Sequence, residues 1–80
     1  MFFYTYVLLC ADGKFYVGST TDLRRRLDEH KAGKVDATRP RLPVRLEYYE
    51  ACRSEAAARL RERQLKTGYG RRYLKERLKT

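Results

Sequence analysis

The sequence has little cysteine and no long apolar segment. Only two of its 80 residues are cysteines, Cys10 and Cys52, and they form no Cys-x-x-Cys pair. This pattern indicates neither a disulfide scaffold nor a zinc site, so both thiols are expected to be small buried groups. The apolar run MFFYTYVLLC is shorter than the roughly 20 residues that cross a bilayer, and it lacks the basic flank and cleavage site of a signal peptide. We therefore expect a strand here, in a cytoplasmic protein with no membrane partner.

Acidic residues are also scarce. Ten Asp and Glu stand against 19 Lys and Arg, which gives a formal net charge of +9. Residues 51–80 hold ten of the cations and three of the acids, so most of the excess charge lies there. Most of the cations are arginines, whose planar fork matches phosphate groups, and we expect a polyanionic partner. Charge alone leaves open a second interpretation, in which the basic side chains only solvate helix faces.

The first half of the chain predicts a β-hairpin followed by a helix. A single domain over residues 1–80 is expected from the length. Residues 2–10 are apolar almost throughout, which favours a central strand covered on both faces. Ala11-Asp12-Gly13 is a turn signal, and Lys14 to Ser19 resumes strand composition. Thr20 or Thr21 is predicted to cap a helix over about residues 21–32, with Asp22 near its positive end and Gly33 as its stop.

The second half predicts one more strand and two helices. Residues 34–43 form a loop, and Val44 to Ala51 return to β-rich composition. Ser54 is predicted to cap a helix that ends near Lys66, Gly68-Tyr69-Gly70 to break it, and Arg71 to Lys79 to form a short third helix. The element order is therefore β-β-α-β-α-α.

Polar residues interrupt the apolar stripes of the first two helices. Leu23, Arg26, Leu27 and His30 follow the spacing of one inward face. Glu62 likewise falls between Ala58 and Leu65 on the apolar stripe of the second helix. The simpler interpretation makes His30 a structural residue and Glu62 a salt-bridge partner. The functional interpretation makes Arg26, His30 and Glu62 members of a site.

The hairpin loop length decides where two tyrosines point. A two-residue turn would place Tyr6 and Tyr16 on opposite faces of the sheet, because side chains alternate along a strand. A three-residue loop, with Gly13 in the left-handed conformation, would pair Tyr16 with Leu8 and place it on the face of Tyr6. Only the second register builds one site from both hydroxyls, and the alternative is that both tyrosines are packing residues.

Taken together, these residues resemble the GIY-YIG nuclease family. Its two tripeptide motifs correspond to Tyr4-Thr5-Tyr6 and Tyr16-Val17-Gly18, and its T-D-L-x-x-R-L-x-x-H run to Thr21–His30. Later blocks of short bacterial members resemble Arg39 and Arg41 ahead of Pro43-Val44, and then Arg61-Glu62 with Leu65-Lys66. The chain departs from the family pattern in having Tyr4-Thr5 in place of Gly-Ile, and in having no asparagine.

The resemblance implies an α+β fold, with a three-stranded antiparallel sheet flanked by helices, and an endonuclease that hydrolyses phosphodiester bonds. It implies one divalent metal, Mg²⁺ or Mn²⁺, and no small-molecule cofactor. Glu62 matches the metal ligand, Gly18 the motif glycine, and the catalytic positions correspond to Tyr6, Tyr16, Arg26, His30 and Glu62. Nucleic-acid contacts are expected from Arg39, Arg41, Arg61, Lys66, Arg71, Arg72 and Lys75.

The expected partner is DNA, with RNA as the alternative, in a DNA repair setting. Members of the family that choose a DNA sequence commonly carry an added binding domain, so we expect either selectivity for DNA structure or only weak sequence specificity. Two further hypotheses stay open: a nucleic-acid-binding module that keeps the fold without catalysis, and a protein-interaction domain with incidental charge. The sequence does not separate the roles of Tyr16 and His30, and it does not define the oligomeric state.

Overall fold

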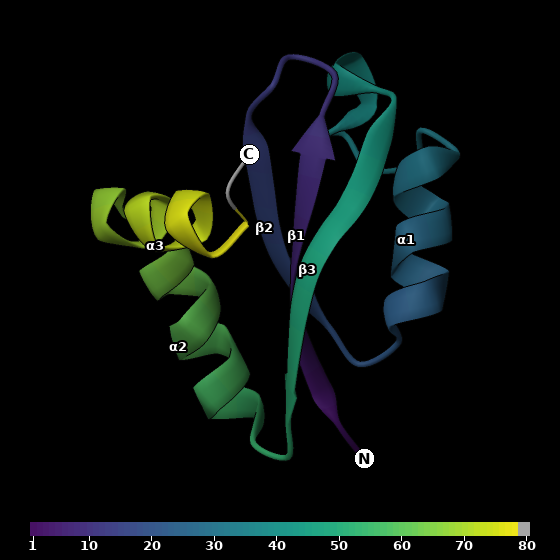
Figure 1. Cartoon of the computed structure of the whole chain (residues 1–80). Helices are drawn as coiled ribbons and strands as arrows, with labels where there is room; N and C mark the ends of the chain where they lie inside the picture. Colours follow the sequence, from purple (N-terminus) through teal and green to yellow (C-terminus); the bar gives the residue numbers. More distant parts are fainter. Residues whose placement is uncertain (79–80) are drawn as a thin grey trace.

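The computed structural model describes residues 1–78, in which three antiparallel strands form one sheet (Figure 1). The strand order is β2-β1-β3, with β1 (Phe3–Cys10) between β2 (Phe15–Thr20) and β3 (Val44–Cys52). The central position of β1 explains its almost continuous apolar sequence, since both faces of a central strand can be covered. The predicted fold class, element order and central first strand are confirmed.

The β1-β2 hairpin has the three-residue loop. Tyr16 pairs with Leu8, and Gly13 has a φ of 80°, the left-handed conformation that glycine adopts without steric cost. The backbone N–H of Cys10 donates to the carbonyl of Lys14 across the loop at 2.9 Å. This register places Tyr6 and Tyr16 on the same face of the sheet.

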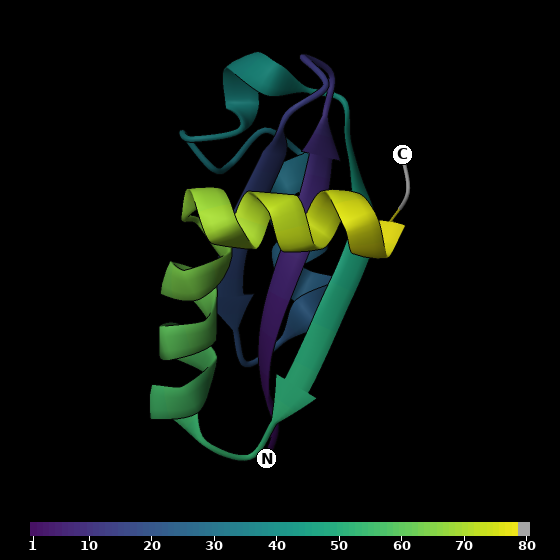
Figure 2. The same ribbon diagram turned by 60° about the vertical axis from the view of Figure 1, so that its left-hand side comes forward.

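The helices cover the two faces unequally. Helix α1 (Leu23–Lys31) lies on one side of the sheet, whereas α2 (Glu55–Leu65) and α3 (Gly68–Leu78) lie on the other (Figure 1). Figure 2 shows α2 running along the sheet and α3 lying across it. Within the predicted loop there is a short 3-10 turn at Arg39–Arg41. Lys79, where the third helix was predicted to end, lies outside the described residues. No helix among residues 1–78 has the length and apolar character needed to span a membrane.

Two apolar clusters form the core, one on each face of the sheet. Under α1, the buried residues are Tyr6, Leu8, Cys10 and Val44. Under α2 and α3, they are Val7, Val17, Leu65 and Leu74. Because side chains alternate along a strand, consecutive residues of β1 contribute to different clusters, and the sheet separates the two clusters.

The cap of α1 differs from the prediction. Asp22 is the N-cap, and its carboxylate accepts from the backbone N–H of Arg25 at 3.1 Å. Thr20, proposed as one of two caps, bonds instead to the backbone of Asp22, which it holds in place before the helix begins. Thr and Asp both serve as caps, so three adjacent candidates could not be ranked by residue type. The predicted Ser54 cap of α2 and the stop at Gly33, which has a φ of 76°, are confirmed.

The start of α3 also differs from the prediction. The helix begins at Gly68 and not at Arg71, and the break between the helices falls at Lys66 and Thr67. The Thr67 hydroxyl accepts from the backbone N–H of Gly70 at 3.1 Å, as a cap does. Gly70 is buried against the end of α2, where a Cβ would collide with the backbone of Gln64 and Leu65. Gly70 therefore allows close packing between α2 and α3 and does not interrupt α3.

This packing predicts different outcomes for two alanine substitutions in α3. Gly70→Ala should lower the free energy of unfolding by about 1 to 3 kcal/mol, because α3 must move away from the α2 backbone. Gly68→Ala is the matched control, since nothing lies within 4 Å of a Cβ at that position. Its stability should be unchanged or slightly raised. Urea unfolding of both variants measures the difference, and equal stabilities would contradict the close approach.

Candidate active site

A chain of hydrogen bonds runs through the interior beneath α1. The Tyr6 hydroxyl lies 2.8 Å from Nε2 of His30, and Nδ1 of His30 lies 2.7 Å from Oγ1 of Thr38. Tyr6 is 1% exposed, and His30 and Thr38 are fully buried. With the imidazole proton on Nδ1, His30 donates to Thr38 and accepts from Tyr6, and the other tautomer reverses both bonds. Three polar side chains are thus satisfied without solvent.

Tyr16 lies against the same pair. Its ring centroid is 5.2 Å from that of His30 and 6.4 Å from that of Tyr6, with tilted or edge-on geometry. This proximity follows from the hairpin register, which places both tyrosines on the α1 face. Tyr16 is only half-buried, so it forms part of the boundary between the buried pair and solvent.

Arg26 brings a positive charge to the Tyr6 hydroxyl. Its side chain is 37% exposed and also donates from an Nη atom to Glu29 at 3.1 Å. Burial raises the pKa of Tyr6 above its ordinary value, and the Arg26 guanidinium beside the hydroxyl opposes that rise without cancelling it. Tyr6 is therefore a neutral phenol at neutral pH.

Gly18 makes room for the Tyr6 hydroxyl. Gly18 is the strand partner of Tyr6, and a Cβ placed on it would lie 2.5 Å from that hydroxyl oxygen. A larger residue here would displace the tyrosine from His30. The motif glycine is thus explained by a close approach across the edge of the sheet.

Glu62 approaches from the opposite face. It lies on α2, and its two carboxylate oxygens accept from Ser19 Oγ at 2.7 Å and from Lys66 Nζ at 2.8 Å. Burial raises the pKa of Glu62, but the hydrogen bonds from Lys66 and Ser19 and the nearby positive charges outweigh it, so the pKa is lower than usual. The carboxylate is therefore ionised at neutral pH. Ser19 is the strand partner of Thr5 and points to the α2 face, so it holds Glu62 on the side of the sheet opposite to Tyr6.

Direct contacts thus bring four of the five predicted catalytic residues together. Tyr6, Tyr16, Arg26 and His30 meet beneath α1, while Glu62 bonds to Ser19 on the α2 face. Its charge is close enough to act on the pKa of Tyr6. The structure therefore brings four of the predicted residues together and places the Glu62 carboxylate on the other face of the sheet.

The Glu62 carboxylate fits a divalent cation that is held weakly by the protein. No cluster of three or more His, Cys, Asp or Glu that could hold a metal is present among residues 1–78. Mg²⁺ keeps several waters and is often bound by one or two carboxylates together with substrate phosphates. Glu62 is ionised and partly exposed, so it fits a site completed by the substrate. It does not fit a closed structural metal centre.

The residues predicted to contact nucleic acid fall into two groups. Several are already paired with acids: Arg39 with Asp36, Arg41 with Asp12, Arg61 with Glu50 and Lys66 with Glu62. Arg71, Arg72 and Lys75 are exposed on α3. The second group is therefore the more direct candidate for phosphate contacts.

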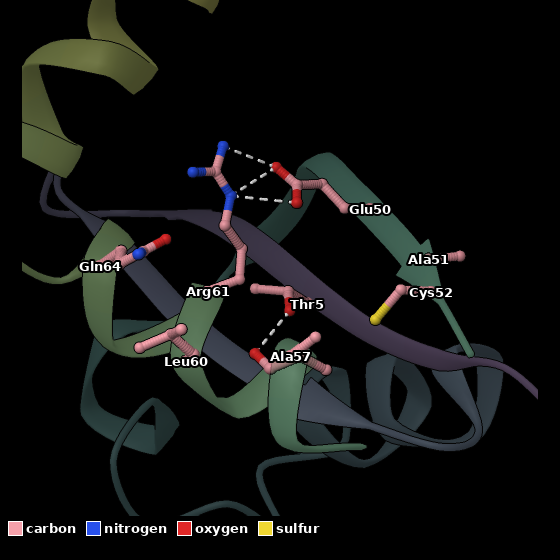
Figure 3. Close-up of a pocket in the computed structure, with 9 residues that line it drawn as sticks. Thr5, Glu50, Ala51, Cys52, Ala57, Leu60, Arg61 and Gln64 are labelled. Atoms are coloured by element: carbon pink, nitrogen blue, oxygen red, sulfur yellow. Dashed lines mark hydrogen bonds and ion pairs between the residues drawn. The ribbon is translucent and has the colours of Figure 1, made fainter. Parts of the chain in front are cut away.

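Arg61 has a structural role that the sequence did not indicate. Its guanidinium contacts both oxygens of Glu50 at 2.9 to 3.0 Å and lies 4.9 Å from the centre of the Tyr73 ring. Figure 3 shows this ion pair at one side of a pocket of about 260 Å³, in which Thr5 bonds to the backbone of Ala58. The ion pair joins α2 to β3, and the ring contact joins it to α3. Phosphate binding would have to compete with Glu50 for this guanidinium.

Thr38 and Ser19 are site residues that sequence reasoning missed. Thr38 lies in the irregular segment before the 3-10 turn, where no periodic pattern marks a buried residue. Ser19 had a recoverable signal, because it directly follows the motif glycine. Its contact with Glu62 depends on how α2 packs, which the local sequence does not specify.

The chain belongs to the GIY-YIG nuclease family. The family model described as the GIY-YIG catalytic domain matches residues 2–77. A UPF0213 protein of Streptococcus agalactiae is 47% identical over 74 residues, which cover 82% of this chain and 84% of that protein. A UPF0213 protein of Streptococcus pyogenes is 57% identical over 56 residues, covering 69% of this chain and 61% of the relative.

A solved structure is also similar. The solution NMR structure of a UPF0213 protein from Bacillus halodurans has a TM-score of 0.59 and 38% identity, covering 92% of this chain and 82% of that one. The family match and the solved structure therefore agree on the family and the fold of this chain.

The buried histidine predicts a pH-dependent stability. Burial lowers the pKa of His30, and the charge of Arg26 lowers it further. An unfolded histidine has a pKa near 6.5, so below that pH the unfolded chain binds one more proton than the folded protein. The free energy of unfolding should therefore fall as the pH drops from 7 to 5, by up to about 1.4 kcal/mol per pH unit.

Urea unfolding at pH 5 to 7.5 measures this slope. His30 is the single histidine, and the carboxyl groups with lowered pKa, Asp12 and Glu62, titrate at lower pH. The control is His30→Gln, which should be less stable at pH 7 and show a flat profile. A flat wild-type profile would contradict a neutral buried imidazole.

Proposed function

We propose that this protein is a metal-dependent endonuclease that hydrolyses phosphodiester bonds in DNA and selects DNA structure more than sequence. The observation that supports this most strongly is the Tyr6–His30 hydrogen bond, with Arg26 and Tyr16 around it. Water attack on a phosphodiester needs a proton acceptor and positive charge near the phosphoryl oxygens. These residues supply both in one place.

Proton transfer is assigned to the Tyr6–His30 pair. The raised pKa of Tyr6 makes a free phenolate a poor description of the base. A neutral His30 accepts the hydroxyl proton of Tyr6 while the Tyr6 oxygen takes a proton from the attacking water. The water becomes the nucleophile, and the proton ends on Nε2 of His30. Burial lowers the pKa of His30, which keeps the imidazole unprotonated before the proton transfer.

The remaining residues are assigned to binding and charge. Arg26 stabilises the negative charge on the phosphoryl oxygens, and Tyr16, at the solvent boundary, positions the phosphate. Glu62 would hold a divalent cation, Mg²⁺ or Mn²⁺, which would supply Lewis-acid stabilisation of the phosphoryl group and the leaving oxygen. Ser19 orients the Glu62 carboxylate. Lys66 donates to the other carboxylate oxygen of Glu62 and would be the nearest cation for a substrate phosphate there.

Exposed cations on α3 are assigned to the DNA backbone. Arg71, Arg72 and Lys75 contact phosphates, with Arg39, Arg41, Arg61 and Lys66 contributing where their acidic partners allow. Phosphate contacts position a protein but carry no direct sequence information. This supports selectivity for structure, in DNA or alternatively RNA. A cytoplasmic location and a part in DNA repair are consistent with this activity.

The proposal predicts that Glu62→Gln separates catalysis from folding. Cleavage that depends on Mg²⁺ or Mn²⁺ should be lost. The stability should change by less than about 1 kcal/mol, because the Lys66 partner is 52% exposed and such helix pairs contribute little. Linear, nicked, flapped and four-way DNA are the substrates, and thermal melting measures the stability.

Glu55→Gln is the matched control for this experiment. Glu55 lies on the same helix and forms the same kind of pair, with Arg59, at an exposed position. It should melt like Glu62→Gln and cleave like the wild type. Wild-type cleavage by Glu62→Gln would refute its assigned role. Wild-type protein that binds these DNAs but cleaves none of them would instead identify a non-catalytic binding module.

A further inference from the structure

A second surface feature lies beside the candidate active site on the same face of the sheet. A groove of about 660 Å³ runs between α1 and the β1-β3 side of the sheet. Tyr4, Tyr49 and Leu46 line it from the sheet, and Leu27, Arg24 and Lys31 are among the residues that line it from the helix. We call it the aromatic groove.

The strand register places the aromatic groove next to Tyr6. Tyr49 on β3 is the direct strand partner of Tyr6, and such partners have Cβ atoms about 4.5 to 5.5 Å apart. Tyr4 is two residues from Tyr6 on β1, so both point to the α1 face. The groove and the candidate active site therefore share one strand and one helix.

Its floor carries two neighbouring tyrosine rings. The centroids of Tyr4 and Tyr49 are 6.1 Å apart with the planes tilted by 59°, and Tyr49 is 52% exposed. Tyr4 occupies the position where the family motif has a glycine, so this chain adds a ring there. Neither hydroxyl is needed for the proposed hydrolysis, and the pair presents aromatic surface to a ligand.

Charges of both signs surround these rings. Arg24 and Lys31 are exposed on the helix side, and so is Asp28 between them. Cations suit phosphate groups, and a carboxylate accepts hydrogen bonds from the amino groups of bases. A ligand with a flat aromatic face, amino donors and an anionic linker matches all three features. In a continuous duplex the face of a base is covered by its neighbours, so the ligand must be unpaired.

We propose that the aromatic groove binds an unpaired nucleobase of the DNA strand that enters the active site. This inference rests on the proposed nuclease function and narrows its substrate to DNA with unpaired nucleotides. Stacking of the base on Tyr49 and Tyr4, with the flanking phosphates on Arg24 and Lys31, then gives selectivity for structure. This stacking does not depend on the DNA sequence, since every base has an aromatic face.

Binding in EDTA tests the inference without cleavage. The probes are a fluorescein-labelled flapped DNA and a blunt duplex of matched length, titrated with wild type, Tyr49→Leu, Tyr49→Phe and Tyr69→Leu. Tyr69 is the matched control, a tyrosine on α3 that is 81% exposed and does not line the groove. Tyr49→Leu should bind the flap roughly 10-fold more weakly and the duplex as before. Tyr49→Phe and Tyr69→Leu should bind both probes like the wild type.

A fluorescent base supplies an independent readout. 2-Aminopurine in the flap should be quenched by stacking with the wild type and with Tyr49→Phe, and not with Tyr49→Leu. Unchanged flap affinity in Tyr49→Leu, or equal loss on flap and duplex, would overturn the inference, and the groove would then suit a protein segment instead. Flap preference that depends on Tyr49 in a protein that cleaves no DNA would uphold this inference and refute the proposed function. Melting temperatures confirm that each variant is folded.

Discussion

The hydrogen bond between Tyr6 and His30 is the constraint around which this small domain is built. Both groups lie in the core beneath α1, and a buried polar group without a partner costs about 1 to 3 kcal/mol. Each neighbouring feature keeps the pair satisfied. Thr38 bonds to the far side of the imidazole, Gly18 leaves space for the phenol, and the three-residue hairpin loop places Tyr16 against both rings. The site and the core under α1 are therefore the same structure.

The two faces of the sheet have different roles. Under α1, polar side chains interrupt the core and form the candidate active site, with the aromatic groove beside them. Under α2 and α3, the core is apolar, and the Arg61–Glu50 pair together with the close approach at Gly70 fixes how the helices sit. That packing sets the position of Glu62 relative to Ser19. The apolar face thus determines where the carboxylate meets the edge strand.

Sequence patterns located most of this arrangement, because the site residues break strong periodicities. Arg26 and His30 fall on an apolar helical stripe. The segment Ala11-Asp12-Gly13 was compatible with two hairpin registers, and the pairing of Tyr16 with Leu8 shows that the three-residue loop is the one formed. Contacts made by irregular segments, or by packing between elements distant in the sequence, could not be predicted from sequence periodicity. Thr38 is buried in a loop without periodicity.

Charge and glycine were the least informative signals. Arg61 appeared in the sequence as one more cation of a basic helix, while its partner Glu50 lies on β3 and is brought to it only by the fold. The glycines at 68 and 70 were expected to break a helix, although Gly70 serves a helix contact. In both cases the residue type admits two roles, and only the tertiary neighbours decide between them.

The central claim is that the Tyr6 hydroxyl, held by His30, takes part in hydrolysis. Single-turnover cleavage of flapped DNA by Tyr6→Phe in Mg²⁺ tests it most directly. The substitution removes one oxygen and leaves the ring in the core, so the protein should remain folded with about 1 to 3 kcal/mol less stability. Cleavage should fall roughly 100-fold or more, as expected when a proton-transfer group is lost, while DNA binding should be unchanged. Cleavage by folded Tyr6→Phe at the wild-type rate would contradict it.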